Sequence, residues 1–185
     1  VLKTQVQSAR RGDVPPLQAL DEIGHTVDRA TELANQMLAL AKVEQLRQQS
    51  EPPITRLDEV LRTVALEISP LIAQRDLDFG IQTEVAPVRA HEWMLRELTR
   101  NLLHNAVRHA PPGSELTVDL RSDAHHTALT LSDHGPGIEP ELASRLFQPF
   151  SAGDVRSGSG LGLAICQEIV QALEGSIALT NREQG

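Results

Sequence analysis

The longest regular pattern in this chain is a run of apolar residues spaced three and four positions apart. Its members are Leu20, Ile23, Val27, Ala30, Ala34, Met37 and Ala41. This spacing marks the seam of a helix that packs against other helices, and Leu33, Leu40 and Val43 widen the apolar stripe. A helix over about residues 17–48 is longer than most helices of globular domains. The pattern therefore favours a helical bundle or coiled coil over a surface helix.

A second helix is expected before this run. Residues 1–11 are expected to form the C-terminal end of that helix. The sequence Gly12-Asp13-Val14-Pro15-Pro16 is typical of a turn between two antiparallel helices. One helical hairpin buries little apolar surface, so we expect two chains to pair into a four-helix bundle as a homodimer. Residues 48–53 are polar and end in two prolines. They are the predicted boundary between a helical part, residues 1–50, and a compact part, residues 51–185.

The compact part mixes two periodicities. Three segments have the apolar spacing of helices, namely residues 57–73, 91–109 and 161–173. Four others alternate as strands do, namely residues 78–85, 116–121, 127–132 and 176–180. Strands and helices do not alternate regularly along the chain. The predicted fold class is therefore α+β, a two-layer sandwich preceded by the helical hairpin.

Composition narrows the possible functions. The formal net charge of −8 argues against a nucleic-acid surface, because phosphate contacts need clustered Lys and Arg. Aromatic residues make up 2% of the chain, too few for a platform on which bases stack. No apolar run approaches the roughly 18 residues that span a bilayer, so no membrane contact is expected of these residues. The single cysteine, Cys166, excludes an internal disulfide and is expected to be a small buried helix residue.

The helix predicted at residues 91–109 carries polar side chains along one face. Glu97, Asn101 and Asn105 are four residues apart and share that face, with Arg108 one turn further on. Such a polar ladder on an otherwise apolar helix needs a partner, unless it is simply a solvated face.

A short motif follows the strand predicted at residues 127–132. Asp133 ends that strand, and two glycines around Pro136 turn the chain sharply, which leaves a carboxylate facing a cleft. A carboxylate accepts hydrogen bonds from an amino group. An ordinary Asp-x-Gly turn is the alternative for this motif alone.

A third motif is a glycine-rich segment before the last predicted helix. Gly158, Gly160 and Gly162 precede that helix, an arrangement that directs backbone amides and a helix N-terminus at phosphate. No strand leads into the segment and its spacing differs from GxGxxG, so it is no Rossmann fingerprint. A flexible linker is the alternative.

In this order and at these separations, residues 97–106, 133–137 and 158–163 resemble the N, G1 and G2 boxes of sensor histidine kinases. The resemblance covers nearly the whole chain. The family belongs to the GHKL superfamily of ATP-binding proteins, which also contains gyrase, Hsp90 and MutL. The resemblance implies the Bergerat ATP-binding fold, with ATP and Mg²⁺ as cofactors.

The resemblance also implies roles for single residues. Asn105 would ligate the Mg²⁺ that bridges the ATP phosphates, and a neutral oxygen donor suits that hard ion. Arg108 and His109 stand where the family often has a Lys and a Tyr near the phosphates and ribose. Asp133 would bind the adenine amine, with Gly135 and Gly137 letting the backbone approach the base. The full set of implied nucleotide-binding residues is Asn101, Asn105, Arg108, His109, Asp133, Gly135, Gly137, Ile138, Phe147, Gly158, Gly160, Leu161 and Gly162.

Asn101 distinguishes two branches of the superfamily. Gyrase-like relatives have a Glu there, which activates water for hydrolysis, and an amide cannot act as a general base at neutral pH. With Asn at this position the site is expected to hold ATP without spending it on water, as a kinase requires. Asn101, Asn105 and Arg108 are the predicted catalytic residues.

The stretch between the second and third boxes departs from the family pattern. Residues 139–157 would form the mobile lid over the nucleotide, with Phe147 and Phe150 matching the F box. Many members carry arginines next to the second Phe, where this chain has Pro149, Ser151 and Ala152. Arg145 and Arg156 are the basic candidates that remain for the γ-phosphate.

No His in the chain is followed by the Glu/Asp and Thr-Pro pattern of the family's phosphate-accepting histidine. The acceptor is therefore expected just before Val1, and one more strand is expected after residue 185. The resemblance implies a response regulator as partner, and the cytoplasmic portion of a bacterial inner-membrane sensor. Two alternatives stay open: a GHKL ATPase of another branch, disfavoured by Asn101 and the helical hairpin, and a non-catalytic regulatory module that binds nucleotide.

Overall fold

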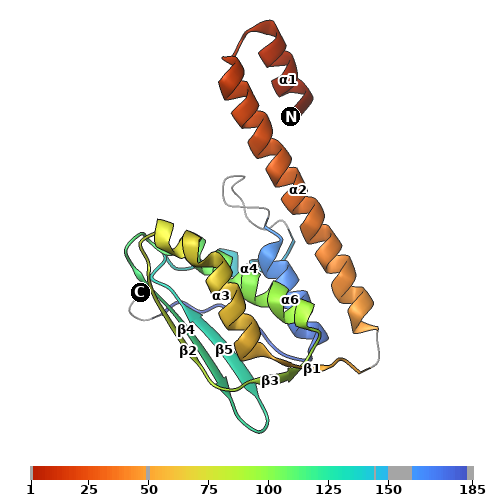
Figure 1. The fold of residues 1–185 in the computed structure, drawn as a ribbon, viewed down its shortest axis with the longest axis vertical. Coiled ribbons are helices and arrows are strands. Elements are labelled where there is room, and N and C mark those ends of the chain that lie inside the picture. Colours follow the sequence, from red (N-terminus) through yellow and green to blue (C-terminus); the bar gives the residue numbers. More distant parts are fainter. Residues whose placement is uncertain (1, 49–50, 144, 150–159, 183–185) are drawn as a thin grey trace.

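The computed structural model describes residues 2–48, 51–143, 145–149 and 160–182. Two helices, α1 (Leu2–Arg11) and α2 (Pro16–Arg47), form a hairpin that rises from a compact part of helices and strands (Figure 1). Gly12 has a φ of +75° in the turn, a conformation that favours glycine. Pro16 begins α2, where its missing N–H removes no helical hydrogen bond. The predicted hairpin is confirmed.

The compact part contains a mixed three-stranded sheet. Its elements in chain order are β1 (Ile54–Arg56), α3 (Leu57–Gln74), β2 (Asp78–Thr83), β3 (Pro87–Arg89), α4 (Glu92–His109), β4 (Glu115–Ser122), β5 (Thr127–Ser132), α5 (Pro140–Ala143) and α6 (Gly162–Ala172). In the sheet, β4 is central, pairing parallel with β2 and antiparallel with β5. The short strands β1 and β3 form a separate antiparallel pair. The α+β fold class is confirmed.

The main core lies between one face of the sheet and the helices α3 and α4 (Figure 1). Along β4 the residues Leu116, Val118 and Leu120 alternate with polar ones and are buried against these helices. Leu61 and Val64 of α3 are fully buried in the same core. The period of two in the strand and of three to four in the helix thus meet in one apolar layer.

A second apolar cluster lies on the opposite side of α4, where α6 packs. It consists of Ala39 and Val43 from α2, Met94 and Leu98 from α4, and Leu161, Ile165, Cys166 and Ile169 from the α6 segment. The C-terminal half of α2 therefore lies against the compact part, as Figure 1 shows. Cys166 is fully buried, as predicted, and burial raises the pKa of its thiol to about 12.

The structure differs from the sequence prediction in two respects. Residues 176–180, predicted as a strand, form no strand in the described part of the chain, which ends at Arg182. Their alternating pattern marks an extended segment, but a strand also needs a partner with which to exchange backbone hydrogen bonds. The short elements β1, β3 and α5 were not predicted, because three or four residues are too few to display a period.

Among the described residues, every helix is too short or too polar to span a bilayer.

Candidate functional site

The polar face of α4 forms one wall of a cleft of ≈ 1220 Å³. Glu97, Asn101, Asn105 and Arg108, the four residues of the predicted ladder, all line it. The rest of the cleft is lined by residues of α2, by residues of α5 and the segment after it, and by the glycines at the start of α6. The ladder therefore faces a cavity between elements that are distant in sequence.

Asn101 is held within its own helix and touches the glycine-rich segment. Its side-chain amide donates a hydrogen bond to the Glu97 carbonyl at 2.9 Å. A Cβ added to Gly162 would lie only 3.0 Å from Oδ1 of Asn101, so the glycine permits the approach of α6 to α4. Gly160 also lines the cleft and has a φ of +69°, in the region that favours glycine. The first and third motifs are thus in contact.

The Asp133 motif lies against the C-terminal end of α4. The Asp133 carboxylate accepts a hydrogen bond from the Gly135 N–H at 2.7 Å. A Cβ on Gly135 would lie 3.2 Å from the backbone oxygen of His109, so the loop passes close to the helix end. His109 lines the cleft, whereas Asp133 is not among its described lining residues. The second motif therefore borders the cleft beside His109.

Three cationic or titratable side chains gather at this end of α4. Partial burial lowers the pKa of His109, and the charges of Arg108 and Arg75 act in the same direction against that of Asp133. His109 is therefore neutral at pH 7 and can both donate and accept a hydrogen bond. Arg75, at the end of α3, donates a hydrogen bond to the Arg108 carbonyl at 3.0 Å and also lines the cleft. The sequence reasoning did not single out Arg75.

The long helix α2 supplies the far wall of the cleft. Asp28, Glu32 and Asn35 of α2 line it together with the α4 ladder. The Lys42 ammonium lies 4.2 Å from the centroid of the Trp93 ring, a cation–π contact that joins α2 to α4. The periodicity of α2 did not reveal which of its polar residues would meet α4.

The remaining predicted site residues have different positions. Leu161 is buried in the second apolar cluster, and Phe147 is partly buried after α5. Arg145 is exposed and is not among the described residues that line the cleft. Gly158, Phe150 and Arg156 lie outside the described residues.

One residue at the end of the described chain was missed. The side-chain amide of Asn181 pairs with the backbone of Ile138, at the end of the Asp133 loop. Its position in the sequence, after α6 and outside every motif, carried no signal of this contact.

The chemistry of the cleft fits a magnesium nucleotide. Asn105 and Glu97 lie on the same wall of the cleft and offer an amide and a carboxylate oxygen, the kind of ligand atom that Mg²⁺ prefers. Asn105 would hold the ion, which in a bound nucleotide neutralises phosphate charge. Arg108 and Arg75 add positive charge nearby, and the α6 N-terminus suits an anion.

Comparison with known sequences finds sensor proteins among the relatives of this chain. The chain is 32% identical over 191 residues to the sensor protein QseC of Escherichia coli O157:H7, covering 100% of this chain and 42% of QseC. It is 30% identical over 191 residues to the sensor protein kinase PmrB of Pseudomonas aeruginosa, with 100% and 40% covered. The chain thus spans about two fifths of the length of these relatives.

Comparison with solved structures and with family models points the same way. The histidine kinase AdeS of Acinetobacter baumannii superposes with a TM-score of 0.80 at 24% identity, over 98% of this chain and 87% of AdeS. At that identity the match shows the shared fold. The model of the histidine kinase-, DNA gyrase B- and HSP90-like ATPases matches residues 90–185, more than half of the chain and all three motifs. The chain belongs to this family of histidine kinase-, DNA gyrase B- and HSP90-like ATPases.

Proposed function

We propose that this chain is the ATP-binding kinase portion of a sensor histidine kinase. It binds Mg-ATP and donates the γ-phosphoryl group to a His on the dimerisation helices, for relay to the receiver domain of a response regulator. The observation that carries the proposal is the convergence of three separate motifs on α4. Gly162 approaches Asn101 on the polar face, and Gly135 approaches the His109 carbonyl at the C-terminal end of the same helix.

Each motif has a distinct task in this proposal. Asp133 binds the exocyclic amine of adenine, a task that suits a carboxylate acceptor. Asn105 holds Mg²⁺, and the glycines at the start of α6 face the phosphates with backbone N–H groups. Arg108 stabilises phosphate charge and His109 binds the ribose hydroxyls, roles that the position of both side chains in the lining of the cleft supports. Phosphoryl transfer needs mainly positioning and charge neutralisation, which this set supplies.

Asn101 favours a kinase over a hydrolase. Its amide is occupied with the Glu97 carbonyl, and an amide cannot take a proton from water at neutral pH. A GHKL ATPase of another branch is therefore the less favoured function. A non-catalytic nucleotide-binding module is the second candidate, supported by Arg145, which is exposed and is not among the described residues that line the cleft.

The hairpin is the proposed dimerisation element, and residues 48–53 are the proposed domain boundary. Leu17 and Leu20 of α2 are 79% and 64% exposed in the single chain, which leaves an apolar face for a second copy. The crystal structure of the histidine kinase ThkA with the response regulator protein TrrA resembles this chain with a TM-score of 0.74. That likeness supports a receiver domain as partner, and the sensor relatives support a cytoplasmic location beside a bacterial inner membrane.

Calorimetric titration with a non-hydrolysable ATP analogue, with and without Mg²⁺, tests the proposal. We expect micromolar binding that weakens when Mg²⁺ is withheld and when Asn105 is replaced by Ala. Equal binding of ADP and the analogue, with no effect of Mg²⁺, would favour the non-catalytic module. Brisk ATP hydrolysis that persists in Asn101→Ala would favour the other ATPase branch.

Light scattering tests the proposed dimer. A protein that is purely monomeric at high micromolar concentration would contradict it.

Transfer to an acceptor tests the kinase step itself. A supplied dimerisation helix that contains a phosphate-accepting His should become phosphorylated by Mg-ATP in the presence of this chain. The matched control is Asp133→Ala, which should lose transfer together with nucleotide binding. Nucleotide binding without any transfer would overturn the kinase and leave the regulatory module.

A further inference from the structure

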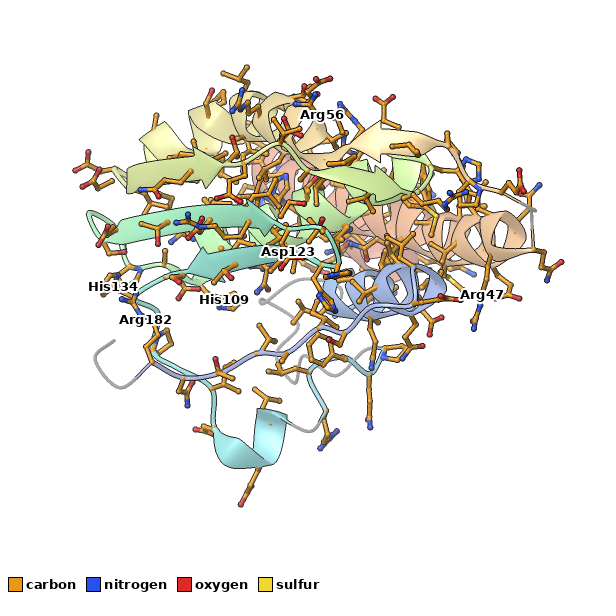
Figure 2. The ribbon with its side chains drawn as sticks, turned by 90° about the horizontal axis from the view of Figure 1, so that it is seen from below. Arg47, Arg56, His109, Asp123, His134 and Arg182 are labelled. Atoms are coloured by element: carbon orange, nitrogen blue, oxygen red, sulfur yellow. The ribbon has the colours of Figure 1, made fainter. Side chains whose placement is uncertain are left out.

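The loop that carries Asp133 is held at its far end by Asn181, which lies 43 residues beyond Ile138. The Ile138 N–H donates a hydrogen bond to Oδ1 of Asn181 at 2.7 Å, and Nδ2 of Asn181 donates one to the Ile138 carbonyl at 2.9 Å. One side-chain amide therefore satisfies both backbone polar groups of a single residue, as a neighbouring strand would. Figure 2 shows the segment that ends at Arg182 running near the loop that contains His134.

The contact extends to the preceding glycine. Gly137 has a φ of +76°, and a Cβ added to it would lie 3.3 Å from Oδ1 of Asn181. Two independent features thus call for glycine here, the left-handed backbone and the closeness of the Asn181 amide. The amide is packed on the loop as well as bonded to it.

The other parts of the loop are held by different elements. His134 Nδ1 lies 3.1 Å from the Glu115 backbone oxygen at the start of β4, and Gly135 packs against the His109 carbonyl. Asp133 itself accepts the Gly135 N–H. The loop of residues 133–138 is therefore held at its start by β4, in its middle by α4, and at its end by Asn181.

We propose that Asn181 is a positioning residue for adenine recognition. A six-residue loop with two glycines has many conformations, so its ordering on ligand binding is costly unless the fold orders it beforehand. By fixing Ile138, Asn181 keeps the loop in the form in which Asp133 faces the base, and this preorganisation raises affinity. The inference rests on the proposed binding of ATP. It adds a residue that orders the part of the site proposed to bind the adenine base.

The position of Asn181 predicts an unequal effect on two ligands. Asn181 contacts the loop of residues 133–138, which is proposed to bind adenine, whereas the residues proposed to bind phosphate lie on α4 and at the start of α6. Removal of its amide should therefore weaken an adenine nucleotide and spare inorganic tripolyphosphate, which has no base. A residue that merely supported overall stability would weaken both ligands alike.

The test compares Asn181→Ala with the wild type and with Thr180→Ala, an exposed neighbour on the same segment. AMP-PNP and tripolyphosphate each displace a fluorescent ATP analogue in the presence of Mg²⁺, and amide hydrogen exchange at Ile138 is followed by NMR. In Asn181→Ala we expect about tenfold weaker AMP-PNP, the scale of two ordinary hydrogen bonds. Exchange at Ile138 should accelerate, and tripolyphosphate and the control variant should be unchanged.

Two results would overturn the inference. One is unchanged AMP-PNP affinity in Asn181→Ala, and the other is an equal loss for both ligands. A wild type that binds neither ligand would instead overturn the proposed ATP function. In that event, exchange at Ile138 still decides whether Asn181 orders the loop, so the two failures are distinguishable.

Discussion

Replacing Gly162 by Ala should weaken nucleotide binding while leaving the stability of the chain almost unchanged. Gly162 begins α6, and a Cβ on it would lie 3.0 Å from Oδ1 and 3.8 Å from Cγ of Asn101. The first distance is tighter than nine in ten real Cβ contacts, so the Asn101 side chain must shift by a few tenths of an ångström. That amide is bonded to the Glu97 carbonyl at 2.9 Å, so the shift weakens or breaks this hydrogen bond.

The two effects of the substitution on stability nearly cancel. Ala is favoured over Gly in a helix by up to about 1 kcal/mol, and the gain is smaller at a first helical position. The loss of the Asn101 hydrogen bond costs about 1 kcal/mol. The unfolding temperature should therefore move by only a few degrees. Nucleotide affinity has no compensating gain, and a displaced Asn101 should weaken it by about tenfold, which is about 1.4 kcal/mol.

The assay pairs calorimetric titration of AMP-PNP in Mg²⁺ with thermal unfolding of the free protein. Gly24→Ala is the matched control, because Gly24 lies inside α2 and a Cβ there meets no atom within 4 Å. It should stabilise α2 by about 1 kcal/mol and leave the affinity unchanged. Unchanged affinity in Gly162→Ala would show that the approach of α6 to Asn101 is not part of the nucleotide site. A large loss of stability would refute the cancellation.

Three further predictions concern the scaffold. Asp58→Asn should lower the free energy of unfolding by about 2 kcal/mol, because Arg56 donates hydrogen bonds to both oxygens of that buried carboxylate and holds its pKa below the usual range. In urea unfolding, the difference in stability between wild type and variant should be full at pH 7 and shrink below about pH 4, where the unfolded chain takes up the proton. A difference that does not depend on pH would contradict this. Lys42→Ala should change the emission of Trp93, the single tryptophan, whereas Lys3→Ala on exposed α1 should not; identical spectra would argue against the packing of α2 on α4. Cys166 should resist iodoacetamide at pH 8 until urea unfolds the chain, because its thiol is buried and its pKa is raised to about 12, and rapid native labelling would refute its burial.

Features that depend on local spacing could be predicted from the sequence. The side chains of Glu97, Asn101 and Asn105 share a face because any helix brings every fourth residue into line, whatever surrounds it. All helices except α5, and the strands β2, β4 and β5, could be predicted for the same reason, within a few residues at each end. The three motifs could be recognised because the order and spacing of their residue types are specific, although each motif is weak alone.

Features that depend on contacts between distant segments could not be predicted. The pairing of Asn181 with Ile138 joins residues 43 positions apart, and nothing in the spacing of either residue anticipates it. Residues 176–180 alternate like a strand, yet alternation does not state whether another strand lies beside them. Asp58 belongs to no sequence motif, and only the fold buries it between Arg56 and the Ala86 N–H.

The apolar stripe of α2 shows the limit of periodicity most clearly, because one stripe faces two different environments. Towards the C-terminal end, Ala39 and Val43 are buried against α4 and α6, and Leu33 and Leu40 pack beside them. Towards the hairpin turn, Leu17, Leu20 and Val27 of the same helix are exposed in the single chain. The residues that widen the predicted seam are thus the ones that contact the ATPase part, while much of the seam itself remains uncovered. A helical period reports that a face is apolar and does not identify its partner. The exposed apolar residues suit a partner outside the single chain, and the proposed homodimer would cover them without displacing the α2 residues that line the cleft.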